Sequence, residues 1–467
     1  PEAVKSGLWF TICGFLQKGI AMLSTPIFTR TLSEKEYGIT STFLAWQVII
    51  NLLVTLTLYR SIMNLYVKYD NKEKVLGYVA GLSITVSTAW TIFAVIFLDP
   101  LSRIMNLSKP LVLCLFLYSI GESIIQCWMM YKRYVYDYKK AVFITLLLSA
   151  ISCFGGVGCV LLIDATAEWR LYPQTIAYLI IGIFLFFIIC IRERAFYKKE
   201  IWTFSLGFCI GLMPHYISEF ILQSSDKIMI NYMCGAEDVA MYSVAYAVGS
   251  LIALFANAVN SAFVPYQYQK IQAKECKELS KTANNVQFML AVILSLLMLF
   301  GEEIVLIFGG YKYISCADVI VPICLGVYFN YMFQMFARVQ EYYNRKLTIV
   351  IPSIACAILN VILNYIFIAK YGYKAASYTT FVCFALFCLI HYFFYLRTCR
   401  NFNQNELIYD GKTLLIISIG ITFIGAVILA IQDNVWLKYT IIILMLIAII
   451  IKRNKVKDII YSMMKPR

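Results

Sequence analysis

Residues 7–29 read GLWFTICGFLQKGIAMLSTPIFT, an apolar stretch with a single charge, Lys18, near its middle. A bilayer core needs about 20 apolar residues for each helix that crosses it, so this stretch is long enough to span a membrane. An ammonium at the centre of such a helix costs ~2.5–3.5 kcal/mol on insertion. We therefore expect Lys18 to face protein or a water-filled cavity rather than lipid.

The composition extends this interpretation to the whole chain of 467 residues. Hydrophobic residues make up 61% of it and charged residues 14%, whereas soluble domains average ~25% charged residues. We predict an all-α polytopic membrane protein with about 14 transmembrane helices. The predicted spans are 7–29, 39–59, 77–98, 110–131, 141–163, 173–191, 202–225, 239–263, 285–308, 317–337, 347–369, 375–396, 413–432 and 434–451.

The placement of the basic residues predicts the orientation of these spans, because Lys and Arg are enriched in cytoplasmic loops. With both termini in the cytoplasm, the inner loops and tails carry roughly three basic residues for each one in the outer loops. Topology signals of this kind also account for the net charge of +14, so we expect no nucleic-acid partner. The 15 cysteines lie mostly inside spans and form no C-x-x-C pair, which indicates neither a metal site nor a disulfide framework.

The loops between the spans are too short to fold by themselves, so function must reside in the helix bundle. This argues against an enzyme of lipid-linked sugars such as a glycan polymerase, and we predict no catalytic residues. The chain has no Walker A loop or other nucleotide motif, which excludes ATP hydrolysis within it as the driving force. We expect no cofactor other than a coupling ion, a proton or sodium.

A weak internal repeat predicts how the spans are grouped. Segment 36–41 (EYGITS) after the first span resembles segment 238–243 (DVAMYS) after the seventh. Six helices in each repeat relate the two halves by a pseudo-twofold axis along the membrane normal. We predict a six-helix bundle over 1–200, a second over 201–400, and two peripheral helices with a basic cytoplasmic tail over 401–467. A cleft between the bundles would allow alternating access.

Polar side chains follow one face of several predicted spans, since residues three or four apart share a helix face. We expect the polar faces of the first, second, seventh and eighth spans, which correspond across the repeat, to line a cavity with a surplus of basic groups. Such a cavity suits an anionic, hydroxylated substrate. The candidate cavity residues are Lys18, Arg30, Gln47, Asn51, Arg60, His215, Glu219, Lys227, Asn257 and Arg338, and the candidate ion-coupling residues are Glu122, Glu219 and Asp226.

Each polar side chain also has a purely structural interpretation. Asn, Gln and Ser between membrane helices often serve only as interhelical hydrogen bonds, worth ~0.6 kcal/mol each. Lys18 and Glu219 are harder to explain in this way, although the two could form a buried ion pair and so neutralise one another. The sequence leaves open whether Lys18 contacts a substrate phosphate or Glu219.

Several short motifs, in order and spacing, resemble Wzx-type polysaccharide flippases of the multidrug/oligosaccharidyl-lipid/polysaccharide exporter superfamily. The first group lies in and after the first span, and the later groups follow the seventh and ninth spans. They are SGLW (6–9), KG (18–19), TPIFTRTLS (25–33), EYG (36–38), DKIMI (226–230), ED (237–238), MYS (241–243), EEIV (302–305) and FGGY (308–311).

The resemblance implies two bundles around a central cavity, and movement of undecaprenyl-diphosphate-linked oligosaccharide from the inner to the outer leaflet for surface polysaccharide biosynthesis. Lys18, Arg30 and Arg60 would engage diphosphate or acidic sugar, whereas His215 and Glu219 match no family pattern. The location implied is the bacterial cytoplasmic membrane. The expected partners are the lipid-linked oligosaccharide, membrane lipids, and the polymerase and glycosyltransferases of the same pathway.

Two alternatives stay open. One is a cation-coupled multidrug exporter of the same fold, and the other, less favoured, is a membrane-embedded glycan polymerase. Lipid II flippases carry several arginines in the first span, whereas this chain has only Lys18 there, which disfavours a peptidoglycan precursor as cargo. The glycan, the coupling ion and the oligomeric state are not predicted.

Overall fold

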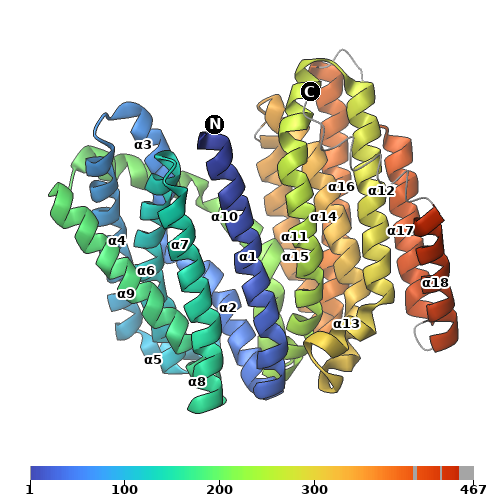
Figure 1. The fold of residues 1–467 in the computed structure, drawn as a ribbon, viewed down its shortest axis with the longest axis horizontal. Coiled ribbons are helices and arrows are strands. Elements are labelled where there is room, and N and C mark those ends of the chain that lie inside the picture. The colour runs from blue at the N-terminus through green and yellow to red at the C-terminus, as the bar shows by residue number, and fades with distance from the viewer. Residues whose placement is uncertain (1, 346, 403–406, 432–433, 452–467) are drawn as a thin grey trace. The chain divides into compact units, whose positions relative to one another are not determined.

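The computed structural model describes residues 2–345, 347–402, 407–431 and 434–451, and it leaves out some side chains within helices. The described residues form helices joined by short turns, and no strand occurs among them (Figure 1). Ten of the described helices are long and apolar enough to cross a membrane, or eleven if a bent helix counts as one span. The prediction of an all-α polytopic membrane protein is confirmed, while the number of fourteen spans stays a prediction.

The elements follow one another in a simple order along the chain, with two 3-10 helices (η1, η3) and one π-helix (η2). They are α1 (Glu2–Thr31), α2 (Glu34–Thr55), η1 (Leu58–Ser61), α3 (Ile62–Lys68), α4 (Lys72–Ile96), α5 (Leu98–Met105), α6 (Lys109–Tyr134), α7 (Tyr138–Ala150), η2 (Ile151–Gly155), α8 (Gly156–Leu162), α9 (Ala167–Glu193), α10 (Lys199–Met233), α11 (Ala236–Gln272), α12 (Cys276–Leu299), α13 (Gly301–Phe308), η3 (Tyr311–Val319), α14 (Ile320–Tyr342), α15 (Leu347–Tyr371), α16 (Lys374–Phe402), α17 (Gly411–Ile431) and α18 (Val435–Ile451).

The predicted ninth span, 285–308, covers two helices rather than one. α12 ends at Leu299, and Glu302 and Glu303 lie in the first turn of the short helix α13. Carboxylates are favourable at that position because the helix dipole is positive at its N-terminus. The two charges therefore lie beyond the end of the spanning helix α12.

Contacts divide the chain into two compact units, Pro1–Ser243 (unit 1) and Val244–Arg467 (unit 2). The predicted boundary between bundles, at 200/201, lies in the first turn of α10. In the structure α10 packs against α2, η1 and α4, so this helix belongs to unit 1. The division into 1–200, 201–400 and 401–467 stays a prediction.

Within unit 1, helix α6 packs against α2, α4 and α9. The approach of α6 to α9 is close because glycines face each other there. A Cβ added at Gly121 would lie 2.7 Å from the Leu179 backbone nitrogen and closer still to the Tyr178 carbonyl oxygen. Small residues of this kind let membrane helices come together and pack along their length.

Within unit 2, α14 packs against α16 and α12, and α16 also packs against α15. The last two helices lie at one edge of this unit, where α17 packs on α12 and α18 lies next to α17 (Figure 1). Their position within unit 2 agrees with the peripheral place that the sequence predicts for them.

Candidate functional site

The second helix of the chain is interrupted at its end. α2 ends at Thr55, and the next two residues, Leu56 and Thr57, have positive φ angles of 47° and 49°. Neither is glycine, and a non-glycine residue in the left-handed region costs about 1–2 kcal/mol. The Thr57 N–H donates to Thr55 Oγ1 at 3.1 Å, and Cys209 Sγ donates to the Thr57 carbonyl at 3.6 Å. These contacts hold a strained turn of the kind found at binding sites, and η1 with Arg60 follows directly.

A second interruption lies in α10, which packs against α2 and η1. The segments Lys199–Pro214 and Tyr216–Met233 meet at an angle of 48°. Pro214 explains the bend, because proline has no N–H to donate and its ring clashes with the carbonyl of the preceding turn.

A cavity of about 220 Å³ lies beside these two interruptions, with walls from α2, η1, α6 and α10. The polar residues that line it are Asn51, Thr55, Thr57, Tyr59, Arg60, Glu122, Ser123, Gln126, Tyr216, Glu219 and Gln223. We call it the Arg60 cavity. It brings together four candidate residues that the sequence places on three separate spans: Asn51, Arg60, Glu122 and Glu219.

Neutral hydroxyl groups hold the guanidinium of Arg60. Its Nη1 donates to the Tyr216 hydroxyl at 2.8 Å and its Nε to the Tyr59 hydroxyl at 3.3 Å. The Arg60 guanidinium carbon also lies 4.2 Å from the centre of the Tyr216 ring, a cation–π geometry. The charge of Arg60 is thus positioned without being neutralised by either tyrosine.

Two carboxylates share the cavity with Arg60. Glu122 Oε1 accepts from Gln126 Nε2 at 2.6 Å, and Glu219 Oε1 accepts from Gln223 Nε2 at 3.2 Å. In the described part of the chain, neither carboxylate forms an ion pair with Arg60. A cavity with one guanidinium and two carboxylates held by neutral amides can receive an anion at Arg60 or a cation or proton at the acids.

Several predicted residues of unit 1 lie away from this cavity. Lys18 and Arg30 are exposed on α1, and the Arg30 Nη1 donates to the Pro26 carbonyl at 3.2 Å. Gln47 is buried, and its Oε1 accepts a hydrogen bond from Gln174 Nε2 at 3.3 Å. This bond joins α2 to α9, which is the structural role that the sequence left open for such residues. Among the residues described, no ion pair joins Lys18 to Glu219.

The remaining predicted residues occupy other places. Asp226 is buried near the end of α10 and accepts from the Tyr242 hydroxyl at 2.7 Å, which ties α11 to α10. Lys227, next to it, is partly buried. Arg338 lies in α14 of unit 2. The backbones of α10 and α11 include His215 and Asn257, but the side chains of these two lie outside the described part of the structure.

Sequence reasoning missed Tyr216 as a site residue. The signal was present, since Tyr216 lies three residues before Glu219 and seven before Gln223, which places all three on one helix face. The contribution of α6 could not be assigned to this site from spacing, because helical periodicity does not show which spans pack together.

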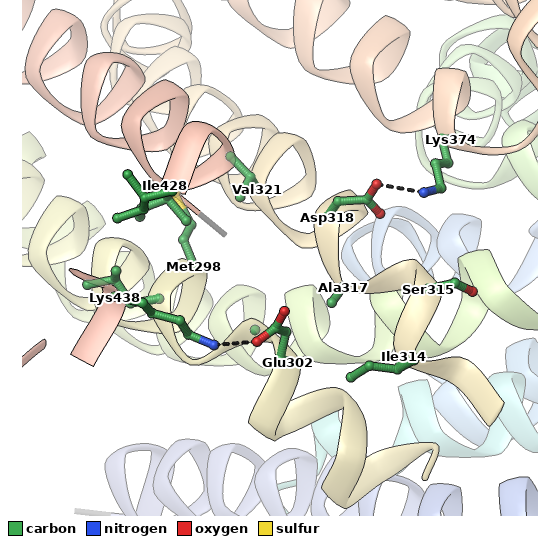
Figure 2. A pocket seen from close by; sticks show the side chains of 13 residues that line it. Met298, Glu302, Ile314, Ser315, Ala317, Asp318, Val321, Lys374, Ile428 and Lys438 are labelled. Carbon is green, nitrogen blue, oxygen red and sulfur yellow. Dashed lines mark hydrogen bonds and ion pairs between the residues drawn. The ribbon is translucent and has the colours of Figure 1, made fainter. Parts of the chain in front are cut away.

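A second cavity, of about 250 Å³, lies in unit 2 and also contains charges (Figure 2). These charges are paired with one another. Lys374 lies 2.6 Å from Asp318, and Lys438 of α18 lies 2.6 Å from Glu302 and 3.0 Å from Glu303 of α13. The Lys438 pairs fasten the last helix to the bundle, so a structural role accounts for them.

The family model described as "polysaccharide biosynthesis protein" matches residues 3–270, more than half of the chain. The chain belongs to this family. A second model, MatE, matches residues 212–366 of this family member.

Individual relatives agree with this assignment. The chain is 22% identical over 331 residues to Lsg locus putative protein 1 of Haemophilus influenzae. The matched region covers 67% of this chain and 79% of the relative. The structure is similar to that of the lipid II flippase MurJ in an inward closed conformation, with a TM-score of 0.69, 17% identity, and coverage of 96% of this chain and 100% of MurJ.

It is also similar to an inward-facing multidrug resistance MATE transporter of the MOP superfamily, with a TM-score of 0.63 and 14% identity over 82% of this chain and 95% of the transporter. At such identities the structural likeness shows a shared fold. The family match over residues 3–270 confirms the resemblance to polysaccharide flippases of the exporter superfamily. The family member is a multi-pass membrane protein of the transporter and flippase fold.

Proposed function

We propose that the protein is a flippase that moves undecaprenyl-diphosphate-linked oligosaccharide from the inner to the outer leaflet of the bacterial cytoplasmic membrane by alternating access, for surface polysaccharide synthesis. The observation that carries this proposal is the match of residues 3–270 to the polysaccharide biosynthesis protein family. In the proposed orientation both termini lie in the cytoplasm. The protein acts as a transporter and carries out no bond chemistry.

In this proposal Arg60 binds the diphosphate of the substrate. Arginine forms short, charge-assisted and often bidentate hydrogen bonds to phosphate oxygens. In the structure its partners are two tyrosine hydroxyls, which an anion can replace. The volume of about 220 Å³ lies below the ~300–1,000 Å³ of typical ligand pockets, so the cavity fits one charged group rather than a whole oligosaccharide.

Glu122 and Glu219 are proposed to bind the coupling ion, a proton or sodium, together with the substrate. Both line the cavity that holds Arg60, and an ionised carboxylate there competes with a phosphate for the guanidinium. A proton or sodium ion at these acids removes that competition and favours the substrate-bound state. Binding of the ion and of the anionic substrate then become linked, because each changes the affinity for the other by the same factor.

Cells that lack the gene and carry variants on a plasmid provide the test. Arg60→Gln is expected to reduce surface glycan strongly and to leave lipid-linked intermediates in the inner leaflet, with the variant present in the membrane at the wild-type level. Arg103→Gln is the matched control, because Arg103 is an exposed arginine of α5 outside the cavity. Normal glycan with Arg60→Gln would sink the assignment of this cavity.

Lys18→Ala separates the two predicted parts of the site. Lys18 is exposed on α1 and does not line the Arg60 cavity. A loss of glycan in this variant would show that Lys18 acts on substrate in another state of the cycle. Normal glycan would leave Arg60 as the only one of these two basic groups that transport needs.

The second candidate is a cation-coupled multidrug exporter, which the MatE match over residues 212–366 favours. Deletion of the gene distinguishes the two functions. Loss of glycan with unchanged drug resistance supports the flippase, while altered drug resistance with intact glycan supports the exporter. Chain extension of a lipid-linked glycan by the purified protein would instead revive the polymerase.

A further inference from the structure

A third cavity, of about 360 Å³, lies in unit 2 where the turn between α14 and α15 meets the end of α16. We call it the Arg345 cavity. α14 ends at Tyr342, α15 begins at Leu347, and α16 runs to Phe402. The residues that line the cavity are Asn344, Arg345, Leu347, Thr348, Phe394, Arg397 and Thr398.

The charge of this lining has one sign. Among the described residues that line it, Arg345 and Arg397 carry the only charges and none is a carboxylate. Within the described parts of the chain, neither arginine forms an ion pair. The Arg345 guanidinium lies 5.1 Å from the centre of the Phe402 ring, a cation–π contact that leaves its charge without a carboxylate partner. This differs from the cavity of Figure 2, where each lysine has a carboxylate partner.

The backbone adds to the positive potential of the Arg345 cavity. Leu347 and Thr348 form the first turn of α15, a helix of 25 residues. The Thr348 N–H and hydroxyl donate to the Arg345 carbonyl at 3.2 and 2.7 Å, which ties Arg345 to this end of the helix. The helix dipole is positive at that end. Two arginines and a helix N-terminus converging on one cavity favour an anion with several acceptor oxygens, as a phosphate group has.

Apolar side chains continue from the cavity along the outer faces of its two helices. Leu347 is 72% exposed and Ile351, one turn further along α15, is 60% exposed, while Phe393 beside the cavity on α16 is 67% exposed. In a membrane protein, exposed apolar faces of spanning helices contact lipid. The anion that occupies the cavity therefore has access to it from the bilayer, with an acyl chain lying along the apolar faces.

We infer that the Arg345 cavity binds the phosphate headgroup of an anionic membrane phospholipid. The predicted orientation places segments 338–346 and 397–412 on the cytoplasmic side, where basic pockets between helices bind anionic headgroups. The site is separate from the Arg60 cavity, since every residue that lines it belongs to unit 2. It does not depend on which cargo the protein carries.

The test measures binding of short-chain phosphatidylglycerol to the purified full-length protein in detergent. Arg345→Gln combined with Arg397→Gln is expected to weaken binding about twenty-five-fold, since each arginine near anionic lipid contributes roughly 1 kcal/mol, a factor of about five. Arg400→Gln is the matched control. It removes an exposed arginine one turn further along α16 that does not line the cavity, and its affinity is expected to equal that of the wild type.

Three competitor arms identify the source of the phosphate. Phosphatidylcholine and inorganic phosphate are both expected to displace phosphatidylglycerol poorly, the first because its net charge is zero and the second because it has no acyl chain. Displacement by inorganic phosphate at equal concentration would overturn the lipid assignment, as would tighter binding of a lipid-linked diphosphate. An equal loss of phosphatidylglycerol affinity in Arg400→Gln would show that binding depends on general surface charge, and it would refute the site. Arg397→Gln alone tests the same point if the double variant does not fold.

Discussion

The close approach of α6 and α9 leads to a quantitative prediction for Gly121→Ala. The new Cβ would lie 2.7 Å from the Leu179 nitrogen, whereas ordinary contacts begin at 3.4 Å. The three nearest atoms, the carbonyl carbon and oxygen of Tyr178 and the nitrogen of Leu179, all belong to the backbone of α9, so no side chain can rotate out of the way. The helices must separate by about 0.7 Å or more, an overpacking that costs about 1–3 kcal/mol.

The matched control is Gly158→Ala in α8, where an added Cβ meets nothing within 4 Å. Both substitutions replace a glycine inside a helix and gain the same helix propensity, about 1 kcal/mol in favour of alanine. The difference between the two variants therefore isolates the steric cost. We expect Gly121→Ala to be less stable than Gly158→Ala by about 1–3 kcal/mol.

Denaturant titration in detergent micelles, followed by circular dichroism, measures the two free energies of unfolding. A second readout is surface glycan, because Glu122 follows Gly121 directly and lines the Arg60 cavity. A displaced α6 shifts this carboxylate, so Gly121→Ala is expected to lower glycan more than Gly158→Ala does. Equal unfolding free energies for the two variants would refute the packing argument.

Three further predictions concern single contacts. Tyr216→Phe removes the hydroxyl that accepts from Arg60, so the guanidinium is freer for a diphosphate and binding of lipid-linked substrate should tighten about fivefold, the worth of roughly 1 kcal/mol; weaker binding would contradict this. Lys438→Met leaves two carboxylates of α13 without their ammonium and should lower stability by about 1–3 kcal/mol, which a fluorescence unfolding curve would detect. Partial burial raises the pKa of Asp137, but the hydrogen bond and charge of Lys132 outweigh it and hold this pKa below its usual range. The stabilisation by this ion pair is present at neutral pH and is lost as the pH falls through the lowered pKa, so Asp137→Asn should flatten the acid side of the stability curve below about pH 4.

The positions of the helices could be read from the sequence with few errors. Most predicted spans overlap one long helix of the structure, although the ninth covers α12 and α13. The agreement arises because a spanning segment must be apolar and must satisfy its own backbone hydrogen bonds. The exceptions are helix breaks at positions where the sequence has no glycine or proline to mark them. Leu56 and Thr57 adopt positive φ angles although neither is glycine, and only contacts such as that from Cys209 make this conformation the stable one.

The composition of the Arg60 cavity was predictable only in part. Helix periodicity placed Glu219 among the candidate cavity residues, and it could have added Tyr216, which lies three residues earlier on the same face of α10. It did not show that Glu122 of α6 joins Arg60 at the same cavity, since that depends on which helices pack together.

Lys18 is a second residue for which the sequence does not show which polar groups share its cavity. Its place in the middle of residues 7–29 makes it the most conspicuous charge in the sequence. It is exposed on α1 and does not line the Arg60 cavity, so its role in transport stays a prediction. The sequence by itself determined the membrane class, the helices and the family, because hydropathy and short motifs are local properties. Only the tertiary structure decided which polar groups share a cavity, because this depends on the breaks in α2 and α10 and on long-range packing against α6.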